Sequence, residues 1–87
     1  MAPIIARFVA ALPTRVHALR AELWVAGSAT LPRLVHQLKG AAGGYGFPAI
    51  SSAAANVEQV LVANGSPDEL ASALDELDAL CRRVREP

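Results

Sequence analysis

Three features that often indicate a function are scarce in this 87-residue sequence: cysteine, aromatic side chains and an excess of charge of one sign. The single cysteine, Cys81, excludes an internal disulfide and a CxxC zinc pair. Together with only two histidines at these spacings it forms no chelating set, so we expect no metal site. Eight basic residues balance eight acidic ones, which leaves no basic excess for nucleic acid.

A long hydrophobic run is also missing. Residues 2–12 are apolar apart from Arg7, but no basic segment precedes them and they are too short to span a bilayer. We therefore expect no signal peptide, no membrane contact and a cytoplasmic location, which a lone cysteine permits. The length fits one domain over residues 1–87. Because so small a domain buries only about 60–65% of its unfolded surface, its chemistry must be simple or borrowed from a partner.

The residues that are abundant favour helices. Alanine and leucine dominate a 53% hydrophobic composition, β-branched residues are a minority, and no strand pattern competes. Five helical segments are predicted, over Pro3–Leu12, Pro13–Trp24, Leu31–Tyr45, Pro48–Ala63 and from Ser66 onward. Pro13 either kinks one long helix or starts a second one. With short connections, we expect an all-α fold, an antiparallel four-helix bundle with a short additional N-terminal helix.

Several residues predict where these helices begin, end and pack. Ser66 and Glu69 form a capping-box pattern, Ser28 or Thr30 suits another N-cap, and Gly46 suits a left-handed residue after a helix. The apolar stripe of the third segment is Leu34, Leu38, Ala41 and Tyr45, widened by Leu31, Val35 and Ala42. Cys81 is expected in the core and His17 on the surface. Tyr45 and Phe47 are expected to hold the end of the hairpin together rather than bind a ligand.

The third segment contains glycines that a purely structural helix would avoid. Gly40, Gly43 and Gly44 each cost roughly 0.5–1 kcal/mol relative to alanine. His36, Lys39, Gly40 and Gly43 follow one another at steps of three and four, so they share one helix face. Bare backbone beside the imidazole would let another protein approach it closely. Alternatively, Gly43 and Gly44 allow close packing of helices.

These residue types suit phosphoryl transfer. A neutral imidazole is a good nucleophile near neutral pH, and Lys39 can offset charge on phosphoryl oxygens. His36 lies eleven residues before Phe47 and Glu58 eleven after, so at ~1.5 Å per residue both lie roughly 16 Å from the turn. We therefore expect Glu58 to accept a hydrogen bond from the Nδ1–H of His36, which leaves Nε2 free to attack. Gln59 is a less favoured substitute.

The run from His36 to Gly40, followed by Gly46 and Ile50, resembles the signature H-x-L-K-G-x5-G-x3-hydrophobic of histidine phosphotransfer (HPt) domains. The stretch 43–47 is also similar to the phosphotransfer domain of chemotaxis histidine kinases. The family carries glutamate or glutamine at the offset of Glu58. The strongest similarity covers about 25 residues, and weaker helical agreement covers nearly the whole chain. One departure is the linker 27–30. Many members carry an aspartate near the end of this linker, and its absence here bears on docking.

The resemblance implies a phosphorelay intermediate rather than an enzyme. His36 would accept the phosphoryl group on Nε2, Lys39 would steady it, and Glu58 would orient the ring. Partner docking would involve four residues of the same segment, Arg33, Gln37, Gly40 and Gly43. The partners would be response-regulator receiver domains and a sensor or hybrid histidine kinase. The receiver would supply the aspartate and Mg²⁺, so the chain itself would need no cofactor, and we expect a monomer.

Two other interpretations remain open at this point. The same helical bundle could be an adaptor that binds a signalling partner through this face without being phosphorylated. It could also be the phosphotransfer domain of a chemotaxis-type kinase, phosphorylated from ATP by a kinase domain elsewhere in that protein. The initial methionine and the length fit a free-standing protein, and an excised domain would look the same.

Overall fold

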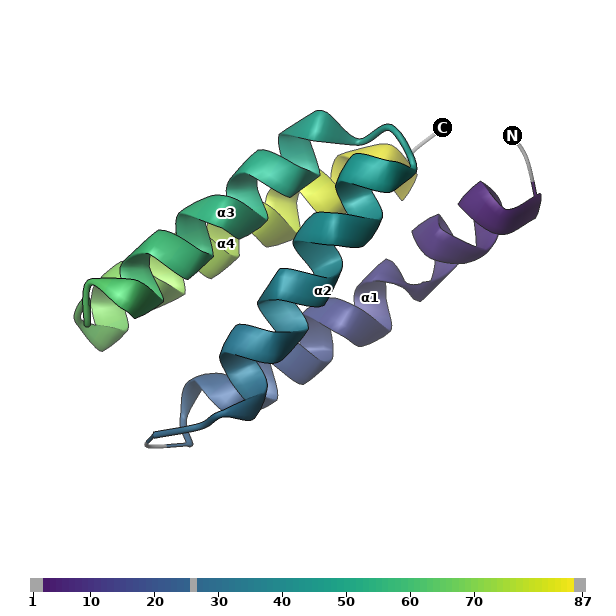
Figure 1. Cartoon of the computed structure of the whole chain (residues 1–87). Coiled ribbons are helices and arrows are strands. Elements are labelled where there is room, and N and C mark those ends of the chain that lie inside the picture. Colours follow the sequence, from purple (N-terminus) through teal and green to yellow (C-terminus); the bar gives the residue numbers. More distant parts are fainter. Residues whose placement is uncertain (1–2, 26, 86–87) are drawn as a thin grey trace.

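The computed structural model describes residues 3–25 and 27–85, and all the regular structure in these ranges is helical. Four helices follow in order: α1 (Pro3–Leu23), α2 (Thr30–Gly44), α3 (Pro48–Val62) and α4 (Pro67–Arg85). Successive helices run antiparallel and form one bundle (Figure 1). The predicted all-α fold and four-helix bundle are therefore confirmed.

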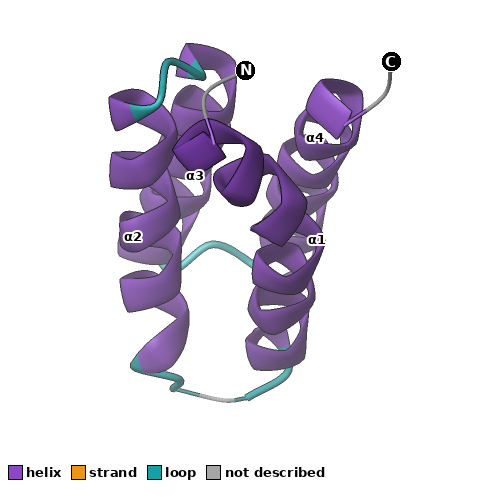
Figure 2. Cartoon of the chain, turned by 90° about the vertical axis from the view of Figure 1, so that its right-hand side faces the viewer, coloured by secondary structure: helices purple, strands orange, loops and turns teal. Residues whose placement is uncertain are grey.

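The N-terminal helix is not a separate element, which corrects part of the prediction. Helix α1 runs without a break through Pro13, so the expected short additional helix is its first half. Phe8 and Leu12 before the proline, and Val16 after it, are all buried. Because the core holds α1 on both sides of Pro13, the lost backbone donor does not end the helix. Figure 2 shows the first turns of α1 leaning across the bundle toward α2.

An aromatic cluster attaches these first turns to the α2–α3 turn. The Phe8 ring lies 5.1 Å from the ring of Tyr45 and 5.6 Å from that of Phe47, between centroids. The guanidinium of Arg15 lies 5.8 Å from the Phe8 centroid. Such contacts stabilise beyond the burial of area alone. Tyr45 and Phe47 therefore pack against the first turns of α1, and their predicted role in holding the end of the hairpin together stays a prediction.

The core runs along the middle of the bundle. Its largest fully buried side chains are Leu12, Leu19, Leu38, Ile50, Leu74, Leu77, Val35, Val57 and Cys81. The buried stripe of α2 is Leu31, Val35, Leu38 and Ala42, whereas Leu34, Ala41 and Tyr45 are only partly buried. All seven predicted positions are thus buried or partly buried, but the most buried are Leu31, Val35, Leu38 and Ala42 rather than Leu34, Ala41 and Tyr45. Burial raises the pKa of the Cys81 thiol to about 11.

The helix ends follow local rules. Ser66 N–H donates to Glu69 Oε1 at 3.3 Å and Glu69 N–H donates to Ser66 Oγ at 3.1 Å, which confirms the capping box. Gly46 has a φ of +86°, the left-handed conformation predicted for it. The N-cap position of α2 is Ala29, so the prediction of Ser28 or Thr30 there was wrong. Ser28, one residue earlier, still accepts a hydrogen bond on its Oγ from Leu31 N–H at 3.2 Å. Within residues 3–25 and 27–85, no helix is long and apolar enough to cross a bilayer.

Candidate functional site

His36 lies in the middle of α2 with 71% of its side chain exposed. Lys39 and Gly40 follow it one turn later, and Gly43 one turn after that, so the predicted common face is present. Arg33 and Gln37, the other predicted docking residues on α2, are also exposed. The second histidine, His17, is exposed on α1, as expected of a surface residue.

Glu58 on α3 contacts both polar side chains of this face. Its Oε2 lies 3.1 Å from His36 Nδ1, and its Oε1 lies 2.6 Å from Lys39 Nζ. The contact between His36 and Glu58 that the hairpin geometry predicted is therefore confirmed, and Glu58 rather than Gln59 makes it. The pairing of Lys39 with the same carboxylate was not predicted. One carboxylate thus joins two residues of α2 to α3.

The Lys39 ammonium lowers the pKa of Glu58; partial burial opposes this effect and His36 adds to it. Glu58 is therefore an anion at neutral pH and can only accept hydrogen bonds. The proton in its contact with His36 must then belong to Nδ1. In a neutral imidazole the other nitrogen, Nε2, is unprotonated and carries the nucleophilic lone pair. The arrangement suits a nucleophilic nitrogen on an exposed surface.

Two of the three glycines of α2 border open space. A Cβ atom built on Gly40 or Gly44 would meet nothing within 4 Å, and one on Gly43 would lie 3.5 Å from Ser51 Oγ, an ordinary contact. Close helix packing therefore does not require Gly40 or Gly44, whereas Gly43 lies against Ser51 of α3 and the packing alternative holds for this glycine. The shared effect of Gly40 and Gly44 is to leave the surface near His36 without side chains.

Ser51 is a residue of this region that sequence reasoning missed. Its Oγ donates a hydrogen bond to the backbone carbonyl of Lys39 at 3.0 Å, across the α2–α3 contact. Ser51 and Glu58 are seven residues apart, so they lie on one face of α3. That spacing is the signal that could have identified Ser51, once Glu58 was placed opposite His36.

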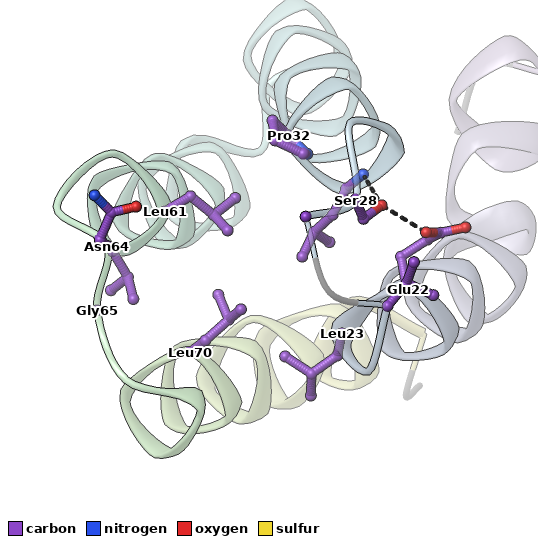
Figure 3. Close-up of a pocket in the computed structure, with 12 residues that line it drawn as sticks. Glu22, Leu23, Ser28, Pro32, Leu61, Asn64, Gly65 and Leu70 are labelled. Carbon is purple, nitrogen blue, oxygen red and sulfur yellow. Dashed lines mark hydrogen bonds between the residues drawn. The ribbon is translucent and has the colours of Figure 1, made fainter.

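A pocket of about 400 Å³ lies where the α1–α2 and α3–α4 connections meet (Figure 3). Leu23, Leu61 and Leu70 form part of its lining, and at its rim Ser28 Oγ donates to Glu22 Oε2 at 2.6 Å. None of His36, Lys39 and Glu58 lines it. Among the described residues, no cluster of three or more histidine, cysteine or acidic side chains could hold a metal ion.

Comparison with known proteins gives one result that covers nearly the whole chain. A protein-family model described as "Hpt domain" matches residues 3–87. No curated protein and no solved structure gives a significant match.

Proposed function

The chain belongs to the histidine phosphotransfer (HPt) domain family, and from this premise we propose that His36 is its phosphoacceptor. Members of the family are phosphocarrier modules of phosphorelay signalling. The observation that supports His36 is the Glu58 carboxylate 3.1 Å from its Nδ1, which directs Nε2 outward to solvent. His17 has no comparable carboxylate contact among the described residues.

The proposed reaction is an exchange of one bond to phosphorus. The Nε2 lone pair of His36 attacks the phosphorus of an aspartyl phosphate, the N–P bond forms, and the acyl P–O bond breaks as the aspartate carboxylate leaves. The ring then carries positive charge, which the Glu58 carboxylate stabilises through Nδ1–H. Mg²⁺ is expected in the partner receiver domain, not in this chain.

Lys39 provides the cation for the transferred group. In the unphosphorylated protein its ammonium binds Glu58 at 2.6 Å, one helical turn from His36. A lysine side chain is long and flexible, so the ammonium can turn from the carboxylate toward the new phosphoryl oxygens. Glu58 would keep its contact with the ring while Lys39 changes partner.

The proposed partners are receiver domains of response regulators and a sensor or hybrid histidine kinase. Receiver and kinase contacts are general to the family. We propose that they use the open face of α2, with Arg33 and Gln37 at its edge and Gly40 and Gly43 beside His36. We further propose that residues 1–87 act as one domain in the cytoplasm, where such partners occur.

The test is transfer of ³²P from a panel of labelled receiver domains. Wild type should gain an acid-labile, base-stable label, and His36→Gln should gain none while keeping its helical circular dichroism. His17→Gln is the matched control and should be labelled like wild type. Label on His36→Gln at the wild-type level would contradict the proposal. A folded protein that binds a receiver but is never labelled would support a non-phosphorylated adaptor instead.

A further inference from the structure

We infer that Ser51 is a positioning residue for Lys39, and that it fixes the turn of α2 from which the lysine reaches the phosphoryl group on His36. The inference rests on the phosphotransfer function proposed above. It concerns a residue on the other helix, α3, that touches neither His36 nor the expected position of the phosphoryl group.

Lys39 is attached to α3 at two atoms. Ser51 Oγ donates to its backbone carbonyl at 3.0 Å, and its Nζ binds Glu58 Oε1 at 2.6 Å. Ser51 and Glu58 are two turns apart on one face of α3, so Ser51 contacts the backbone of Lys39 and Glu58 contacts the end of its side chain. When the ammonium leaves Glu58 for a phosphoryl group, the bond from Ser51 remains.

The turn after Lys39 needs such support. Gly40, Gly43 and Gly44 lie within the next five residues, and glycine lowers the stability of a helix because its backbone is less restricted. The Lys39 carbonyl already accepts the helical hydrogen bond from the residue four positions later. A carbonyl has two lone pairs, so the Ser51 hydroxyl adds a second bond without replacing the first.

Ser51 contacts this turn from the side that faces α3, which is not part of the proposed docking surface. The outward side of Gly40 and Gly44 is free of neighbours, as a docking surface requires. Ser51 is half-buried between the helices, and its Oγ lies 3.5 Å from the position of a Cβ on Gly43. It therefore steadies the backbone of α2 without covering the surface beside His36.

The expected effect is on the rate of transfer rather than on docking. Without the Ser51 bond, the Lys39 turn can shift relative to α3, and the ammonium is placed less often beside the phosphoryl oxygens. Ser51→Ala should lower the maximal transfer rate by about three- to tenfold, the scale of one hydrogen bond. The receiver concentration at half-maximal rate should not change, because Ser51 lies away from the exposed face.

The experiment compares Ser51→Ala with Ser51→Thr, which keeps the hydroxyl, and with Ser52→Ala, the exposed neighbouring serine. Thr should restore most of the rate, and Ser52→Ala should behave like wild type. In a Lys39→Met background, Ser51→Ala should cause no further loss, since its effect acts through Lys39. Amide hydrogen exchange at Gly43 should rise in Ser51→Ala, while exchange at Val57 in the core stays unchanged.

Two results would overturn the inference. The first is a wild-type transfer rate for Ser51→Ala. The second is the same rate loss with and without Lys39, which would make Ser51 a purely structural residue. Failure of the proposed function is recognised separately, because wild type itself would then take no label. Labelled wild type, unlabelled His36→Gln and unaffected Ser51→Ala would remove this inference alone.

Discussion

Two carboxylates in this bundle each bridge two basic side chains, one on each side of the molecule. On the α1–α4 side, Asp78 Oδ2 lies 3.1 Å from Arg20 Nη2 and 3.2 Å from Arg82 Nη2. On the α2–α3 side, Glu58 joins Lys39 to His36. The two arrangements look alike, but the basic side chains differ in how easily they can move away from the carboxylate.

The partners of Asp78 are permanent cations in a rigid planar form. Arg20 also binds Asp75 Oδ1 at 2.8 Å, and its hydrogen bonds to Asp75 and Asp78 raise the pKa of Arg20 further. Neither α1 nor α4 contains a glycine. Glu58 instead holds a flexible lysine and an exposed imidazole beside a glycine-rich turn. The comparison teaches that the charge pairs of the α1–α4 side involve rigid arginines, whereas Glu58 pairs with a flexible lysine, as the proposed change of partner by Lys39 requires.

The largest expected effect comes from adding a side chain to the open face. Gly40→Leu should slow transfer by about 100-fold, because a bulky group beside His36 displaces the partner. The free energy of unfolding should stay the same or rise by about 0.5–1 kcal/mol, since leucine favours the helix and nothing lies within 4 Å to clash. Receiver transfer kinetics and urea unfolding measure the two effects.

Gly40→Ala is the control for this change. It should give the same gain in stability, with a transfer rate much closer to that of wild type. A wild-type rate for Gly40→Leu would mean that the glycines of α2 do not serve to keep the surface beside His36 open.

On the α1–α4 side we expect a smaller effect, which lowers the stability of the fold and leaves the transfer rate unchanged. Asp78→Ala should lower the free energy of unfolding by about 1 kcal/mol, because it releases two arginines from a side chain that is only 14% exposed. Transfer to the folded protein should be unchanged. Asp75→Ala, with a side chain 69% exposed, is the matched control and should cost less. Slower transfer in Asp78→Ala would show that the two sides are not independent.

The smallest expected effect is a pH dependence of stability at Glu58. Its pKa is lower in the folded protein than the ordinary 4.5, so the ionised form stabilises the fold above that pH, and the contribution is lost as acid protonates it. The stability difference between wild type and Glu58→Gln should therefore shrink as pH falls from 6 to about 3, by at most about 1 kcal/mol. Urea titrations at several pH values measure it. Parallel curves for the two proteins would contradict the role of the ion pair.

Much of the fold could be predicted from local signals. The Ser66–Glu69 capping box and the left-handed Gly46 can be predicted from neighbouring residues alone. The equal distance of His36 and Glu58 from the turn at Phe47 can be predicted from the rise per residue of a helix. The path of α1 through Pro13 could not be predicted, because packing of distant side chains decides between a kink and a break.

The site was predictable to a similar degree. His36 and Glu58 follow from spacing, and their contact is present at 3.1 Å. The pairing of Lys39 with Glu58 did not follow, because a long side chain can reach several partners from one position. Ser51 did not follow either, since a helix serine with no pattern of its own gains a role only from the carbonyl that α3 brings beside it.

The contact of Phe8 with Tyr45 and Phe47 also has a kinetic consequence. The α2–α3 hairpin closes over a short turn, whereas Phe8 must find rings almost forty positions away in the sequence. Since contacts of low sequence separation form at a smaller entropic cost, we expect the hairpin to form first in the folding transition state. Phe8→Ala should then speed unfolding and leave the folding rate nearly unchanged, as stopped-flow measurements would show. A matching drop in the folding rate would place the aromatic contact in the folding nucleus.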